Sequence, residues 1–96
     1  MSKKAKRLSR MRRNKKTVRY DDLISALEDH GFTIRPAKGS HIVAKRVSDE
    51  RTISITIVKP HQSKFVKAAY VTLALKEIDN VLAEQASEEE ANGTED

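Results

Sequence analysis

The sequence predicts an α+β domain in which a helix, three antiparallel strands and a second helix follow one another. Aliphatic and hydroxyl side chains alternate over residues 52–57, which is the period of a strand with one apolar and one wet face. Before and after the strand-like segments, apolar residues recur at helical spacing. Because such a sheet offers one apolar face and both helices need burial, we expect both helices to pack on that same face.

The first helix is predicted over residues 21–30. Asp21 or Asp22 is the expected N-cap or first-turn acid. His30 is most simply a cation at the helix C-terminus, and Gly31 is the residue expected to end the helix. The apolar residues that share one helical face are Tyr20, Leu23, Ile24 and Leu27.

Three short strands are predicted next, over residues 32–35, 40–47 and 51–58, with Pro36 ending the first. Alternation in the second strand places Ile42 and Ala44 on the core face. The opposite, open face then carries His41, Val43 and Lys45 beside Thr52, Ser54 and Thr56 of the third strand.

The second helix is predicted to begin near Gln62 or Ser63 and to end near Glu84. Its apolar surface is wider than one helical face. One explanation is deep burial against the sheet, and the other is a second apolar face for a partner, including a homodimer through this helix. The residues that widen it are Phe65, Val66, Ala69 and Leu73. The predicted layout is that of a double-stranded-RNA-binding domain, although fold alone does not give function.

Charge divides the 96 residues into three parts. Ten of the first nineteen residues are Lys or Arg, with no acid among them, whereas six acids and no base occur from Glu84 onward. Neither end has enough apolar side chains to offset the loss of chain entropy on folding. We therefore expect a disordered basic arm over residues 1–19, a folded domain over 20–84 and a disordered acidic tail over 85–96.

The composition is compatible with a small protein of a reducing compartment. It contains no cysteine, so disulfides and thiolate metal sites are excluded. No apolar run approaches the roughly 20 residues of a membrane span. The basic arm lacks the apolar segment of a secretory signal, although its Arg content leaves a transit peptide as an alternative. The expected location is the cytoplasm.

The chemistry-bearing residues gather around His41 on the open face. Lys38, Gly39 and Ser40 lie at the start of its strand, and Lys45 lies farther along the same face. Arg35 and Lys59 end the neighbouring strands and are weaker candidates for the same RNA-binding surface. These groups favour a phosphate backbone as ligand. A positioned imidazole can also take a proton from a ribose 2′-hydroxyl near neutral pH.

A simpler interpretation stands beside this one. A single His on a strand is most often an ordinary surface residue, and Lys-Gly-Ser turns are common. His61, the secondary candidate, is equally a residue near a helix start. The His residues are widely spaced and no acid repeats at ligand intervals, so we expect no metal and no other cofactor. From the residues alone, RNA binding is favoured and catalysis stays open.

Residues 20 to about 82 resemble the HicA toxins, the ribonuclease half of HicA–HicB toxin–antitoxin pairs. The resemblance rests on three segments in order: Asp29-His30-Gly31-Phe32, then Gly39-Ser40-His41, then Lys59-Pro60-His61 followed by Ala74-Leu75-Lys76-Glu77-Ile78. It implies metal-independent cleavage of mRNA, His41 as the catalytic residue and a HicB antitoxin as partner. The chain departs from the family in its basic arm, acidic tail and long second helix, and in Ile42, where many members carry a second His.

Three functions are therefore weighed: an endoribonuclease toxin, a non-catalytic RNA-binding module, and an interaction protein without RNA activity. The basic arm is interpreted as a nonspecific RNA or ribosome tether, with a solvated tail as the alternative. The acidic tail can also fold back on the arm, but exposed charge pairs are individually weak.

Overall fold

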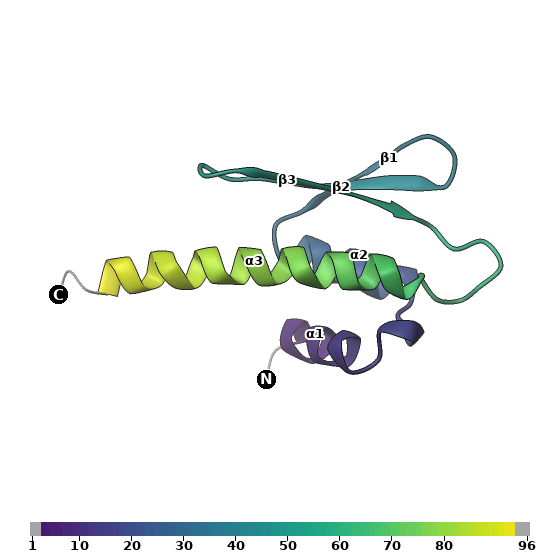
Figure 1. The fold of residues 1–96 in the computed structure, drawn as a ribbon, viewed down its shortest axis with the longest axis horizontal. Coiled ribbons are helices and arrows are strands. Elements are labelled where there is room, and N and C mark those ends of the chain that lie inside the picture. Colours follow the sequence, from purple (N-terminus) through teal and green to yellow (C-terminus); the bar gives the residue numbers. More distant parts are fainter. Residues whose placement is uncertain (1–2, 94–96) are drawn as a thin grey trace.

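The computed structural model describes residues 3–93, with side chains described to residue 86. Its elements are α1 (Lys3–Arg13), the 3-10 turn η1 (Lys15–Thr17), α2 (Tyr20–Asp29), β1 (Thr33–Pro36), β2 (His41–Val47), β3 (Thr52–Val58) and α3 (Ala68–Gly93). The sheet lies above α2 and α3, and α1 lies below them (Figure 1). The expected α+β layout, with α2 and α3 on one face of the sheet, is confirmed.

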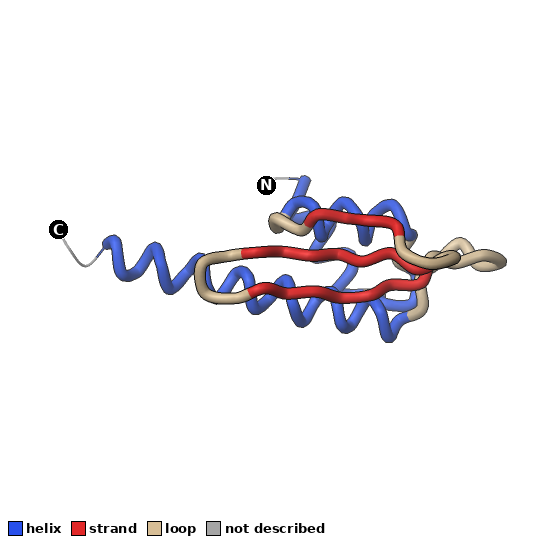
Figure 2. The backbone as a smooth tube through the Cα atoms, turned by 90° about the horizontal axis from the view of Figure 1, so that it is seen from above, coloured by secondary structure: helices blue, strands red, loops and turns tan. Residues whose placement is uncertain are grey.

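The three strands form one antiparallel sheet in the order β1-β2-β3 (Figure 2). Each strand begins and ends within one residue of its predicted bounds. The predicted alternation also holds, because Ile42 and Ala44 are buried while His41 and Lys45 are exposed. In β3 the buried residues are Ile53, Ile55 and Ile57. We call the sheet face directed away from α2 and α3 the open face.

Helix α2 matches its prediction to within one residue, with one difference at its start. The N-cap is Arg19, whose side chain makes no capping hydrogen bond, so Asp21 and Asp22 are first-turn acids rather than caps. They complement the positive helix end. At the other end, the His30 ring donates through Nδ1 to the carbonyl of Ala26 at 2.7 Å, so this imidazole has a structural role.

The predicted start of the second helix at Gln62 or Ser63 is wrong, because α3 begins at Ala68. Just before this start, Phe65 and Val66 pair with the N-terminal segment. The Val66 amide donates to the Val18 carbonyl at 2.9 Å, and Arg19 and Phe65 form an isolated β-bridge. These nonlocal bonds satisfy backbone groups that a longer helix would otherwise have used.

The prediction that residues 1–19 are disordered is also wrong for the residues described. Residues 3–13 form α1, and Met11 is only 2% exposed. Leu8 packs against the same core, and Val18 is 4% exposed. These apolar side chains help to hold α1 because α2 and α3 present a surface that the sheet does not cover.

Helix α3 continues into the predicted acidic tail as far as Gly93. Glu84 pairs with Arg46 at 3.3 Å and with Arg51 at 3.1 Å, at the far end of the β2–β3 hairpin. The last three residues, 94–96, and the side chains beyond residue 86 lie outside the described part. A fold-back of the tail on the arm therefore stays a prediction.

The wide apolar surface of α3 is shared among three neighbours. Ala74, Ile78 and Val81 are fully buried beneath the sheet and α2, whereas Val66 is covered from the side of Val18. Leu73 and Leu82 are each 37% exposed. Of the residues that widen the surface, only Val66 is buried, whereas Ala69 and Leu73 are exposed, so the homodimer through α3 stays a prediction. In the part of the chain described, no helix combines the length and apolar character needed to cross a membrane.

Candidate functional site

Three strand ends meet at one end of the sheet. β1 ends at Pro36, β2 begins at His41 and β3 ends at Val58, and the antiparallel register pairs His41 with Val58 and Pro36 with Ile42. We call this place the His41 end of the sheet. Because side chains alternate, His41 projects to the open face, where its side chain is accessible to solvent.

The His41 ring has a fixed hydrogen-bonding state. Its Nδ1 lies 3.1 Å from the carbonyl oxygen of Lys38, and the His41 amide donates to the same carbonyl at 3.2 Å. A carbonyl oxygen only accepts, so Nδ1 carries the proton. In the neutral ring Nε2 is then the unprotonated nitrogen, available to accept a proton from a substrate.

The turn before His41 depends on Gly39. Its φ of +65° lies in the left-handed region, which L side chains adopt rarely. A Cβ placed there meets no heavy atom within 4 Å, so the space above the Gly39 backbone is open. The glycine thus forms the turn and leaves the backbone accessible to a ligand. The Ala37 amide closes the turn by donating to the His41 carbonyl at 2.8 Å.

His61 is brought to the same place by the connection that follows β3. The Lys59 amide donates to the Ser40 carbonyl at 2.9 Å, which extends the β2–β3 pairing by one step. Beyond it the chain returns so that the Ser40 hydroxyl and His61 Nε2 form a hydrogen bond. The structure therefore brings His61 into contact with Ser40, which precedes it by 21 residues and is next to His41 in the sequence.

Two of the predicted basic residues share the open face with His41. Arg35 pairs with Val43, one pleat along from His41, and Lys45 lies in the next row with Thr33 and Ser54. Both side chains are exposed. Lys38 lies in the turn itself, and its side chain is exposed as well. Phosphate oxygens that approach His41 would meet positive charge on two sides.

Lys59 differs from the other candidates. Its backbone lies at the His41 end of the sheet, but its ammonium is 5.2 Å from the centre of the Tyr20 ring, over the ring face. Burial, with a smaller effect from the charge of Asp21, raises the pKa of Tyr20. The phenol therefore stays neutral and interacts with Lys59 as an aromatic ring.

Among the described residues, the site lacks two features found in many hydrolases. Among the described side chains no carboxylate hydrogen-bonds to His41 or His61. The described residues also contain no cluster of three or more His, Asp or Glu side chains with the spacing of a metal site. What the arrangement offers is two imidazoles, one hydroxyl, an open glycine turn and nearby cations.

Sequence reasoning ranked His61 second and missed its contact with Ser40. Part of this contact follows from the antiparallel register, which places Ser40, the residue before β2, opposite Lys59, the residue after β3. The rest depended on the path of residues 60–67, of which those after Gln62 or Ser63 were predicted to be helical.

Comparison with protein families gave one match. The model described as HicA toxin of bacterial toxin–antitoxin matches residues 20–79, which span α2, the whole sheet and the first half of α3. Helix α1 lies outside the matched residues. Comparisons with curated proteins and with solved structures gave no match.

Proposed function

The chain belongs to the HicA toxin family of bacterial toxin–antitoxin systems, and we propose that it acts in the cytoplasm as a metal-independent endoribonuclease that cleaves mRNA. The observation that carries this proposal is the state of His41. Its ring is exposed on the open face, is oriented by the Lys38 carbonyl and has Nε2 free to accept a proton.

The proposed reaction is a transesterification within the RNA strand. His41 Nε2 removes the proton from a 2′-hydroxyl, and the resulting oxygen attacks the adjacent phosphorus. The bond from phosphorus to the 5′-oxygen of the next nucleotide breaks, and that oxygen leaves after it gains a proton. The products are a 2′,3′-cyclic phosphate and a 5′-hydroxyl, and no oxidant, reductant or further reactant is needed.

His61 is our second candidate, as the group that supplies a proton to the leaving oxygen. Its support is the hydrogen bond to Ser40, the residue next to His41. An acid placed on the side opposite the base is what an in-line displacement requires. Because Ser40 touches His61 and not the scissile bond, we assign Ser40 a positioning role.

The basic groups have a separate task in this proposal. Lys38, Lys45 and Arg35 attract the backbone and stabilise negative charge on the phosphorus oxygens as the bond order changes. The open space above Gly39 admits a phosphate close to the backbone. Lys59, held over Tyr20, contributes to the long-range field at this end of the sheet.

The first prediction tests His41 directly. Changing His41 to Ala is expected to lower the rate of cleavage of a single-stranded RNA by a factor of roughly 10² to 10⁴, since a general base is removed. Cleavage is measured on end-labelled RNA in the presence of EDTA, with circular dichroism to check the fold. His30→Gln is the control, because it removes an imidazole that hydrogen-bonds to the Ala26 carbonyl of α2. Undiminished cleavage by His41→Ala contradicts the assignment.

The same experiment separates the second candidate function, a non-catalytic RNA-binding module. That function is favoured by the number of exposed cations on the chain and by the absence, among the described side chains, of a carboxylate that orients either imidazole. In that case RNA is retained on the protein and recovered at full length by the wild type.

The partner that we propose is a HicB-like antitoxin. Family membership supports an antitoxin in general, and the open face is the surface that such a protein must cover to stop cleavage. Co-expression with the product of the neighbouring gene should restore growth. A complex that leaves His41 reactive to diethyl pyrocarbonate would contradict coverage of this face.

A further inference from the structure

Four of the seven cations of helix α1 form a set that we call the basic stripe: Lys3, Lys6, Arg10 and Arg13. Steps of three and four residues place them on one helical face. Leu8 and Met11 lie on another face and pack into the core. All four cations are exposed, and within the described side chains none of them pairs with a carboxylate.

Two other arginines of α1 fix this helix in place. Arg7 pairs with Asp29 at the end of α2, and Arg12 makes a two-pronged pair with Asp79 of α3, in which one bond is 3.1 Å long. These anchors flank the buried apolar residues. The basic stripe is therefore held on an ordered helix, and less conformational entropy is lost when it binds a ligand than a disordered arm would lose.

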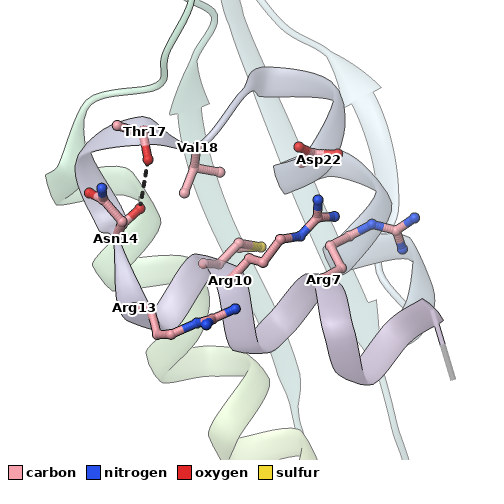
Figure 3. A pocket seen from close by; sticks show the side chains of 8 residues that line it. Arg7, Arg10, Arg13, Asn14, Thr17, Val18 and Asp22 are labelled. Carbon is pink, nitrogen blue, oxygen red and sulfur yellow. Dashed lines mark hydrogen bonds between the residues drawn. The ribbon is translucent and has the colours of Figure 1, made fainter. Parts of the chain in front are cut away.

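Two adjoining hollows lie along the basic stripe, with volumes of 380 and 620 Å³. Arg10 and Arg13 line both, and the smaller hollow adds the side chains of Asn14 and Thr17 (Figure 3). Guanidinium, amide and hydroxyl groups together are donors suited to phosphate oxygens. One carboxylate, Asp22 of α2, also lines the smaller hollow and opposes an anion there.

We propose that the basic stripe binds the phosphodiester backbone of nucleic acid, at a second site separate from the His41 end of the sheet. From Lys3 to Arg13 the helix rises about 15 Å, close to the length of four phosphates along one strand of a duplex, at about 3.4 Å each. Of the apolar side chains that line the two hollows, Met11 and Val18 are buried in the core and Ala5 is small, so the exposed surface lacks the large apolar or aromatic centre that a protein interface normally has. Such contacts carry no sequence preference.

The position of the stripe decides what it does. It lies on the far side of α2 and α3 from the sheet, so nucleic acid bound there leaves the open face free (Figure 1). A short substrate engages one site at a time, whereas a long RNA or a structured RNA particle reaches both. The stripe then raises the local concentration of RNA near His41 without taking part in cleavage.

The test is a binding measurement on the full chain with two 20-nucleotide probes of one sequence, a DNA and a 2′-O-methyl RNA that lacks the attacking hydroxyl. Lys6→Gln combined with Arg10→Gln is expected to weaken binding of both probes roughly tenfold at 50 mM salt and to reduce the slope of log K against log salt by about 2. Glutamine keeps helix propensity. Asp22→Asn should strengthen binding.

The matched control is Lys64→Gln combined with Lys76→Gln, which removes the same charge from exposed positions outside α1. It should change affinity less than about twofold. An equal loss of probe affinity in both double variants, or no loss of affinity in the stripe variant, would overturn the proposal. So would a loss confined to one probe, or normal nucleic-acid binding combined with lost antitoxin binding.

The outcome is separable from that of the proposed ribonuclease. Lys6→Gln with Arg10→Gln should leave the cleavage rate of a five-nucleotide RNA at low salt unchanged, whereas His41→Ala stops cleavage and keeps probe binding. Point variants are used because deletion of residues 1–17 would also remove Met11 from the core.

Discussion

His41 and His61 reach the same end of the sheet by different routes. His41 arrives there by strand alternation, which is local, and its exposure on the open face was predicted and is observed. His61 belongs to the connection after β3, and its bond to Ser40 depends on where α3 begins. Residue identity alone therefore locates one imidazole and leaves the second undetermined.

At the residue scale, the dependence of Ser40 on His61 can be measured. If Ser40 only positions His61, Ser40→Ala should lower the cleavage rate about tenfold and His61→Gln by about 10² or more. The double variant should then be no slower than His61→Gln, because the two residues act through one group.

Thr56→Ala is the control, since Thr56 of β3 is exposed on the open face and pairs with Val43 of β2. Losses that multiply in the double variant would mean that Ser40 and His61 act independently.

At the scale of elements, the strands were predicted closely because the alternation of side chains is a local property. In β3 this alternation runs without interruption from Thr52 to Ile57. The start of α3 was not predicted, since the backbone of Val66 bonds to Val18, 48 residues earlier in the chain. Helix α1 was missed for a related reason. Its two apolar residues, Leu8 and Met11, stabilise the helix only when they pack against the surface of α2 and α3.

The docking of α1 predicts the effect of Met11→Ala. Removing a side chain that is 2% exposed should cost about 2 kcal/mol, and the cost should fall mainly on α1, whose docking depends on Met11 together with Leu8 and the ion pairs of Arg7 and Arg12. Amide hydrogen exchange in residues 3–13 should then accelerate roughly 30-fold, since about 1.4 kcal/mol corresponds to a factor of ten. Amides of β2 should change much less.

Ser9→Ala, an exposed position of the same helix, serves as control. If exchange in α1 is the same in Met11→Ala as in the wild type, then Met11 does not hold the helix.

At the scale of the whole molecule, the chain forms three layers: the sheet, then α2 with α3, then α1 (Figure 1). The family match begins at Tyr20, yet the folded unit described here begins at Lys3. Ion pairs connect the third layer to the second, through Asp29 and Asp79. The open face and the basic stripe thus lie on opposite outer surfaces.

The link between α1 and α3 predicts a dependence on pH. The hydrogen bond from Arg12 lowers the pKa of Asp79, with the charge of Arg12 as a smaller cause. A lowered carboxyl pKa gives stability that is present above the ordinary value and is lost as pH falls through the value in the folded state. Because this pair is exposed, the contribution should be about 0.5 kcal/mol.

The measurement compares the wild type with Asp79→Asn in urea unfolding between pH 7 and pH 3. The difference in the free energy of unfolding should be present at pH 7 and should decline as the pH falls below about 4. High salt should also reduce it. A difference that persists unchanged at pH 3 would contradict an ionic origin.

The sequence by itself determined the α+β class, the three strands, α2 and the exposure of His41, because each follows from a periodicity of two or of about 3.6 residues within one segment. The tertiary structure decided that residues 3–13 of the basic arm form a helix, that α3 begins at Ala68 and that Ser40 contacts His61. Each of these depends on atoms from distant segments. Their free energy comes from surfaces that exist only after the sheet and helices have packed.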